Sequence, residues 1–552
     1  MKKLLLALAL AGVLSAQPAP NSDVNARIRH EEAEHSQIMH TLHMLTDRYG
    51  PRMTGTPNLE AAARWVAKQL TDWGFQNAHL EAWEFGHPGW LNDRASGFIV
   101  SPVKANLKFE VLAWTPSTKG TVTGSAIELV LPQGPPVPAN EAAGGRGGRG
   151  GLGGRGGPQF LPPTRAELSA WLDANKDKIR GKVVMLSKAA VIPMNFEPEA
   201  RRLPDDQVRA QYDPNNPNGG RRGGFGAGGR GNTDPSRVTT TELRDMVDAW
   251  LIANGALVRM NDAARDHGLI VAQQHNAYDP SRTIPTVIAR NEDYGRIERL
   301  LADGDDVKLE FNIQNTLYPE GKTTYNVSGE IPGTDKADEI VMLGGHLDSW
   351  HSATGATDNG IGSSMMMEAA RIIQALGLKP RRTIRVALWS GEEEGLLGSL
   401  AYVKQHFGTF ENPKPEFARL DCYFNIDSGT GRPRGASVFG PAAAAAIMRS
   451  ALDPFADLGV MGANPTSSRA TGGTDSTSFN NAGLPGVGFQ QDPIEYGTET
   501  HHTNLDTYER IIPADVKTGA TVIAASVWYV ANLDQMIPRF TRGTMPAPVA
   551  AR

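Results

Sequence analysis

Residues 340–348, IVMLGGHLD, predict a buried β-strand that ends at His346. Four apolar residues in a row are typical of a strand that is covered on both faces. Further along, Ile361, Met365, Ala369, Ile372, Ile373 and Leu376 recur at helical spacing, and two more apolar strands follow at 384–388 and 423–426. This order of strand, helix and strand predicts an α/β fold: a mixed, largely parallel sheet sandwiched by helices.

Histidine, aspartate and glutamate, residue types that can bind metals, occur at the ends of these predicted strands or in the loops that follow. They are His346, Asp358, Glu392, Glu393, Asp427 and, further along the chain, His502. The carboxyl ends of the strands in such a sheet are where sites are built. Imidazole and carboxylate suit Zn²⁺ when no thiolate is used. Five ligands with one shared carboxylate suit two zinc ions, and the spare glutamate suits a general base that acts on water.

Each motif alone also has an ordinary structural explanation. Asp358 lies just before the helix at 361–376 and would serve as a helix cap. Glu392 and Glu393 would form a solvated acidic helix start. The joint occurrence of the motifs favours the metal site. Asp348 and Asp506, each a few residues from a candidate histidine ligand, are expected to orient those imidazoles.

Composition narrows the class of protein. The 552 residues allow two or three domains, and the net charge of −5 does not indicate a nucleic acid or an anionic membrane as partner. The single cysteine, Cys422, excludes an intrachain disulfide, and its apolar surroundings predict a buried residue without a chemical role. No Gly-X-Ser-X-Gly elbow for a nucleophilic serine is present.

The N-terminus has the pattern of a signal peptide. Lys2 and Lys3 precede an apolar run at 4–14, and cleavage is expected near Ala16. The run is too short to span a bilayer. We therefore expect a periplasmic or secreted protein with a signal peptide at 1–16, the alternative being a buried N-terminal helix.

Three further regions are expected. A catalytic domain takes residues 24–117 and 319–545, and an inserted β-rich second domain takes 118–318, with strands at 182–186 and 268–272 and a helix at 242–254. Two glycine and arginine tracts, 144–157 and 219–231, are expected to be disordered loops. RNA binding, the alternative for such tracts, fits an exported enzyme poorly.

The active-site motifs together resemble the M28 family of zinc peptidases, and most of all its carboxypeptidase Q branch. The matching segments are GGHLDS around His346, GATDNG around Asp358, WSGEEEGLLGS around Glu392 and HTNLDT from His502. Residues 50–55, GPRMTG, resemble the N-terminal segment of the family, and 179–186 and 284–311 resemble a protease-associated insert. The resemblance covers most of residues 30–540, outside the two glycine and arginine tracts.

The resemblance implies a role for each residue. His346 and Asp427 would bind one zinc ion, Glu393 and His502 the other, and Asp358 would bridge the two. Glu392 would be the general base. His501 is expected near the metals as a donor to the developing oxyanion, or otherwise as an auxiliary or exposed residue. The peptide bond from Asp358 to Asn359 is expected to be cis, as in relatives.

The function expected is that of a zinc exopeptidase acting on peptides, with a homodimer left open. Whether it is an aminopeptidase, a dipeptidase or a carboxypeptidase is also open. Two alternatives use the same fold: a metal-free receptor or binding protein, and a glutaminyl cyclase with one zinc ion. The complete ligand set favours the two-zinc enzyme over both.

Overall fold

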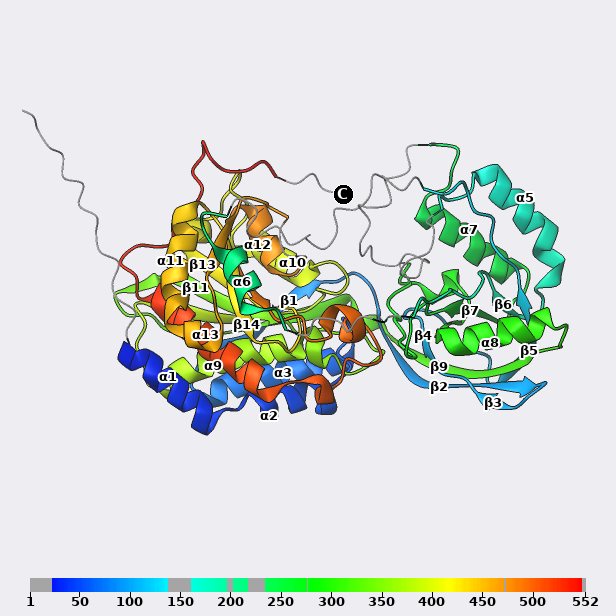
Figure 1. Ribbon diagram of the computed structural model, residues 1–552, viewed down its shortest axis with the longest axis horizontal. Helices are drawn as coiled ribbons and strands as arrows, with labels where there is room; N and C mark the ends of the chain where they lie inside the picture. Colours follow the sequence, from blue (N-terminus) through cyan, green and yellow to red (C-terminus); the bar gives the residue numbers. More distant parts are fainter. Residues whose placement is uncertain are drawn as a thin grey trace, which may run out of the picture.

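Two eight-stranded sheets organise the computed structural model (Figure 1). The structure describes residues 22–137, 160–194, 196, 202–216, 234–275, 277–470 and 473–548. The predicted signal peptide and both glycine and arginine tracts lie outside these residues. Along the described chain, no helix combines the length and the apolar character that a membrane span requires.

The first sheet contains the strands predicted after residue 320. Its order is β1 (Gln76–Glu84), β10 (Thr323–Ile331), β12 (Arg382–Trp389), β11 (Lys336–His346), β13 (Leu420–Asn425), β16 (Gly486–Gln491), β14 (Pro433–Phe439) and β15 (Ala463–Thr466). The four central strands β12, β11, β13 and β16 are parallel. At one edge, β10 pairs antiparallel with β12, and β1 pairs antiparallel with β10. The predicted mixed α/β fold is confirmed.

Helices cover both faces of the first sheet. One face carries α1 (Ser22–His35), α2 (Ile38–His43), α3 (Pro57–Asp72), α9 (Ile361–Ala375), α11 (Ala442–Leu452) and α13 (Pro513–Ala531). The other carries α10 (Leu397–His406) and α12 (Ser476–Ala482). Successive residues of β11 alternate between these two cores: Val341 and Leu343 pack on the first, and Ile340 and Met342 on the second. The uninterrupted apolar run therefore arises because each face of the strand is buried.

The second sheet begins earlier in the chain than predicted. Its order is β3 (Ala105–Asn106), β2 (Gly89–Ser101), β9 (Lys308–Tyr318), β5 (Val122–Glu128), β6 (Val183–Met185), β7 (Val258–Asp262), β8 (Thr286–Ala289) and β4 (Phe109–Val111). Helices α5 (Arg165–Asn175), α7 (Thr240–Ala253) and α8 (Asn291–Ala302) belong to the same domain. The predicted boundary at residue 118 is wrong, because β2, β3 and β4 precede it and pair with later strands of this sheet.

The chain thus leaves the first sheet after β1 and returns to it at β10. We call the part built on the second sheet the second domain. Within it, the helix predicted at 242–254 is confirmed as α7. The strand predicted at 268–272 is wrong: this segment forms an isolated bridge from Val271 to Thr503 instead of joining the sheet. Its backbone is used for contacts with the first domain.

One short helix from the middle of the second domain's sequence packs on the first domain. Helix α6 (Asp205–Tyr212) lies beside the first sheet in Figure 1. The Tyr212 hydroxyl donates to Gln490 at 2.8 Å, and Arg202, just before the helix, pairs with Asp515 at 2.7 Å. Buried Arg434 pairs with Asp205 at the start of α6. The two domains are therefore joined by this excursion as well as by the β1–β2 and β9–β10 connections.

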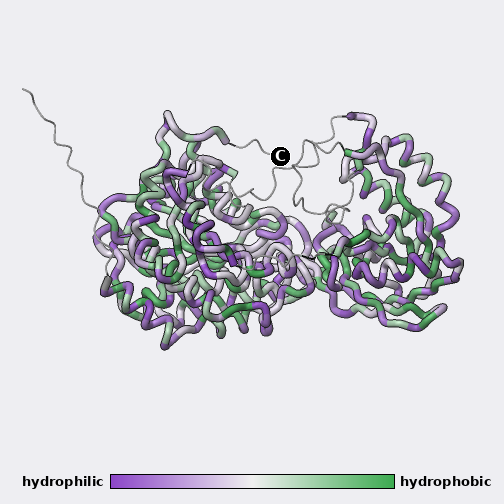
Figure 2. Tube along the Cα trace, viewed as in Figure 1, coloured by the Kyte–Doolittle hydropathy of each residue, from purple (hydrophilic) through white to green (hydrophobic). Residues whose placement is uncertain are grey.

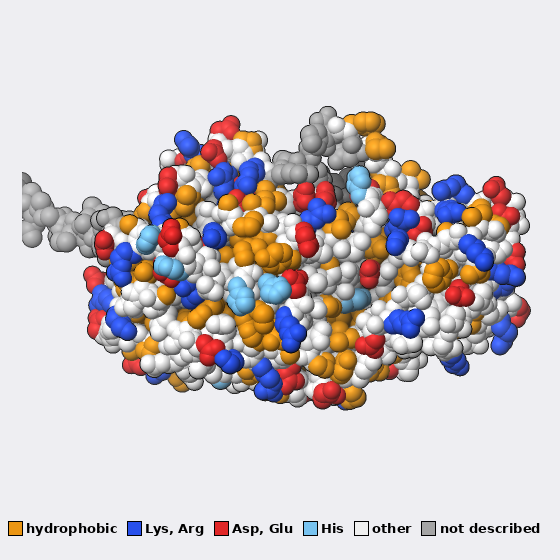
Figure 3. Space-filling view, turned by 90° about the horizontal axis from the view of Figure 1, so that it is seen from below, with side chains coloured by type: hydrophobic (Ala, Val, Ile, Leu, Met, Phe, Trp, Pro, Cys, Tyr) orange, Lys and Arg blue, Asp and Glu red, His pale blue; other side chains and the backbone are white. Residues whose placement is uncertain are grey.

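The distribution of apolar and charged residues agrees with two packed domains. Hydrophobic segments run through both (Figure 2), and each has its own buried core. On the face seen from below, acidic and basic side chains are interspersed (Figure 3). Cys422 is buried, as predicted.

Shortening a central apolar side chain of β11 should destabilise the protein. Leu343 is fully buried, so Leu343→Ala leaves a cavity, and the free energy of unfolding should fall by about 2–5 kcal/mol. Urea unfolding followed by circular dichroism measures this change. Leu400→Ala is the matched control, because Leu400 is 39% exposed and should have little effect. Equal effects of the two substitutions would contradict the assignment of β11 to the core.

Candidate metal centre

The candidate ligands converge at one edge of the first sheet. His346 is the last residue of β11, Glu392 and Glu393 follow β12, and Asp427 follows β13. Because these three strands are parallel neighbours, their carboxyl ends lie side by side. The turn before α9 adds Asp358, and the loop after Tyr496–Thr500 adds the two histidines.

Two clusters share the carboxylate of Asp358. Its Oδ1 lies 3.2 Å from His346 Nε2, and its Oδ2 lies 3.1 Å from His502 Nε2. The Oδ1 atom of Asp427 lies 3.6 Å from His346 Nε2, and Glu393 Oε2 lies 2.9 Å from His502 Nε2. Each oxygen of Asp358 therefore faces a different histidine, and each histidine has a further carboxylate beside it.

The two clusters fit zinc. Ligand atoms at about 2.0–2.2 Å from a tetrahedral ion lie about 3.3 Å from one another, close to the separations found here. Within the described residues, His346 Nε2, Asp358 Oδ2 and both carboxylate oxygens of Glu393 are buried and have no hydrogen-bond partner. Buried polar atoms without partners are costly in a protein interior. Metal coordination would satisfy all of them.

The electrostatics of the cluster favours positive charge. Burial lowers the pKa of His346, but Asp427 and Glu392 raise it, and the net result is a pKa well above the ordinary value. The pKa of His502 shifts in the same direction, because Glu393 and Asp358 outweigh its burial. Burial and, to a smaller extent, Asp358 raise the pKa of Glu393, with His502 and His346 opposing the shift. Positive charge among these groups would stabilise the ionised carboxylates.

The two adjacent glutamates face different histidines. Glu393 contacts His502, whereas Glu392 Oε2 lies 3.9 Å from His346 Nε2. Asp348 fixes the backbone of their loop, because its carboxylate accepts hydrogen bonds from the N–H groups of Glu392 at 3.2 Å and Glu393 at 3.1 Å. The separation of the two side chains allows one to bind a metal while the other faces the space beside it.

One of the two predicted orienting contacts is different in the structure. The Nδ1 atom of His346 lies 3.0 Å from the backbone carbonyl of Asp348 and 3.6 Å from its carboxylate Oδ1, which also accepts from the glutamate loop. The carboxylate of Asp506 does not orient His502; it accepts from the N–H groups of Thr357 and Asp358. It therefore fixes the turn that presents the shared carboxylate, and the bond from Asp358 to Asn359 in that turn is cis, as predicted.

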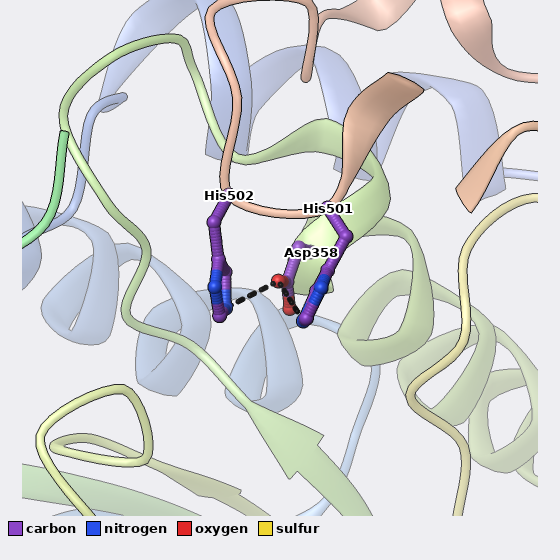
Figure 4. Close-up of side chains that lie close together, drawn as sticks. All are labelled: Asp358, His501 and His502. Atoms are coloured by element: carbon purple, nitrogen blue, oxygen red, sulfur yellow. Dashed lines mark ion pairs between the residues drawn. The ribbon is translucent and has the colours of Figure 1, made fainter. Parts of the chain in front are cut away.

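His501 lies on the open side of the cluster. Figure 4 shows the rings of His501 and His502 on either side of the Asp358 carboxylate. The Nε2 atom of His501 is 3.6 Å from Asp358 Oδ2, and its side chain is 33% exposed. Its position near the cluster agrees with the expectation, and it is the more accessible of the two histidines.

Three residues near the centre were not identified from the sequence. The Tyr496 hydroxyl lies 3.5 Å from Asp427 Oδ1, and the Gln273 amide lies 3.0 Å from His502 Nδ1. Arg52 is completely buried, and its guanidinium donates to the carbonyls of Leu347, Leu45, Thr354 and Gly355. The GPRMTG motif contained Arg52, but nothing in the spacing linked Tyr496 or Gln273 to the metal ligands.

Comparison with known proteins identifies the region that carries the site. Residues 326–527 match the family model "Peptidase family M28". Carboxypeptidase Q of Mus musculus is 32% identical over 257 residues, which are 46% of this chain and 52% of the relative. Leupeptin-inactivating enzyme 1 of Streptomyces exfoliatus is 35% identical over 173 residues, 31% of this chain and 36% of that enzyme. The chain spans about half the length of the curated relatives most similar to it.

Solved structures show the same fold over most of the chain. A peptidase M28 precursor from Shewanella amazonensis aligns with a TM-score of 0.62 at 22% identity, covering 95% of this chain and 99% of that one. A zinc aminopeptidase from Bacillus subtilis aligns with a TM-score of 0.50 at 18% identity, covering 89% of this chain and 94% of that one. The arrangement of both domains therefore has precedents among solved structures.

Removing the guanidinium of Arg52 should destabilise the protein strongly. Burial lowers the pKa of Arg52 to about 10, with Asp506 and Asp348 opposing the shift, so the group remains charged at neutral pH. Arg52→Met would leave buried carbonyls without a donor and carboxylates without a nearby cation. The free energy of unfolding should fall by about 3–5 kcal/mol, measured by urea unfolding. In the control, Arg64→Met removes an exposed arginine and should leave the midpoint unchanged. An unchanged urea midpoint for Arg52→Met would contradict the stabilising role assigned to Arg52.

Proposed function

We propose that this chain, whose residues 326–527 match the model of peptidase family M28, is an exported exopeptidase that hydrolyses peptide bonds with two zinc ions. The observation that carries the proposal is the pair of buried clusters that share Asp358, one oxygen to each histidine. A single metal site would not require a carboxylate in this shared position. Export is supported by the signal-peptide pattern at 1–16.

We assign the ligands according to the two clusters. His346 and Asp427 would hold one ion, His502 and Glu393 the other, and Asp358 would bridge them. When bound, the two ions would lower the pKa of a shared water and polarise the scissile carbonyl. The chain's own contribution is to hold these groups in a buried, rigid edge of the sheet.

Glu392 is assigned as the general base. Its carboxylate faces the His346 side of the cluster and is buried, and burial followed by nearby Asp427 and Glu393 raises its pKa above the ordinary value, with His346 opposing. Such a carboxylate takes the proton from the attacking water and later delivers it to the leaving amine. His501 would donate a hydrogen bond to the carbonyl oxygen as negative charge develops there.

The substrate is proposed to be the end of a peptide chain. The second domain reaches the edge of the metal centre, since Val271 pairs with Thr503 next to His502, and this would limit access to long chains. The relatives named above include a carboxypeptidase and a leupeptin-inactivating enzyme. We leave aminopeptidase, dipeptidase and carboxypeptidase activity as alternatives within this class.

Metal analysis combined with a peptide panel tests the proposal. Inductively coupled plasma mass spectrometry should find about two zinc ions per chain, because each cluster fits one. A glutaminyl cyclase would have one ion, and a receptor on this fold none. Small peptides with each terminus blocked in turn should then show which free end is required. Efficient cleavage inside a peptide blocked at both ends would exclude an exopeptidase.

The adjacent glutamates should respond differently to loss of charge. Glu392→Gln should keep both zinc ions while kcat falls at least about a hundredfold, because the amide cannot accept the proton. Glu393→Gln is the matched variant one residue away, and it should lose metal at one site because it removes a ligand charge. Zinc content and kcat on a dipeptide measure the two effects. If Glu392→Gln loses zinc and Glu393→Gln keeps it, the two roles are reversed.

A further inference from the structure

We propose that Gln273 of the second domain is a positioning residue for the metal ligand His502. The Nε2 atom of His502 faces Asp358 and Glu393, at 3.1 and 2.9 Å. The other ring nitrogen, Nδ1, lies 3.0 Å from the amide nitrogen, Nε2, of the Gln273 side chain. The inference rests on the proposed function in one respect, that a zinc ion lies between Nε2 and the two carboxylates.

Metal binding at Nε2 determines what Nδ1 must do. A neutral imidazole that binds a metal through Nε2 carries its proton on Nδ1, which is then a hydrogen-bond donor. In the structure the Gln273 nitrogen faces Nδ1, and a half-turn of the carboxamide brings its oxygen to the same place, where it can accept this proton. The accepted hydrogen bond would set the tautomer, orient the ring and raise the basicity of Nε2.

The backbone of Gln273 is held from the second domain. Ala113 N–H donates to the Gln273 carbonyl at 3.0 Å, and His275 N–H donates back to the Ala113 carbonyl at 2.9 Å. Ala113 closely follows strand β4, so the second domain fixes the position from which the Gln273 side chain extends. Only the rotamers of the side chain then remain to be ordered when Gln273 meets His502.

The same segment is also hydrogen-bonded to the loop that carries His502. Ile270 N–H donates to Asn504 Oδ1 at 2.9 Å, and Asn504 N–H donates to the Ile270 carbonyl at 3.1 Å. His502 itself has a φ of +62°, in the left-handed region that residues other than glycine seldom adopt. Such a conformation persists where its surroundings hold it, and here residues 270–273 of the second domain do so.

The two metal-binding histidines thus differ in what orients them. His346 is oriented from its own loop, through the carbonyl of Asp348, whereas His502 is met by a side chain from the other domain. It follows that zinc affinity at the His502 site depends on how the second domain is docked. Affinity at the His346 site should depend on it less, because only the shared Asp358 links the two sites.

Zinc affinity measured on the full chain tests the inference without relying on peptide hydrolysis. The apoprotein is prepared with a chelator, and zinc is titrated in competition with a fluorescent chelator. Gln273→Met keeps the length of the side chain and removes the hydrogen bond, so one site should bind zinc about 10- to 100-fold more weakly while the other changes much less. Gln273→Glu keeps an oxygen acceptor and should restore the affinity of that site.

The control is Gln274→Met, one residue further along the same segment. The Gln274 side chain accepts from the Tyr278 hydroxyl at 2.6 Å, so this substitution should leave both zinc affinities unchanged. Wild-type affinity at both sites in Gln273→Met would overturn the inference. If Gln273→Met and Gln274→Met both weakened zinc binding, and each did so equally at the two sites, the inference would also be overturned. Such a result would indicate general loosening of the segment. A wild-type chain that binds no zinc would instead overturn the proposed function.

Discussion

Buried negative charge at the carboxyl edge of the first sheet is the constraint on which the rest of the site depends. Asp348, Asp358, Glu392, Glu393 and Asp506 all lie within the protein interior. Isolated ionised carboxylates are very costly there unless hydrogen bonds or positive charges compensate them. The protein supplies backbone N–H groups to Asp348 and Asp506, and it leaves Asp358 and Glu393 to the histidines and, in our proposal, to zinc.

Arg52 also compensates the buried negative charge. It is buried and donates to carbonyls of the loops that carry the ligands. It therefore joins the N-terminal segment to the loops after β11 while placing a fixed positive charge near the carboxylates. Metal ligands on loops need this kind of support, because a displacement of about 1 Å is enough to spoil a coordination geometry.

The second domain contributes to the site through short contacts and not through its sheet. Helix α6 and the residue Arg202 before it are attached to the first domain by ion pairs, and Ile270 makes two hydrogen bonds with Asn504 of the His502 loop. Of these two attachments, only the second reaches the loop that carries a candidate metal ligand, and it brings Gln273 to His502.

The sequence by itself determined the fold of the first domain and the identity of the residues that converge at its edge. Uninterrupted apolar strands and a 3.6-residue stripe are local patterns, and parallel strands bring their carboxyl ends together in any order. Only the tertiary structure decided which partner meets each ligand. Asp506 has a suitable spacing to His502, but its carboxylate is bound to the backbone N–H groups of Thr357 and Asp358. Gln273 meets His502 across 229 residues, a contact made by the docking of two domains and by no pattern along the chain.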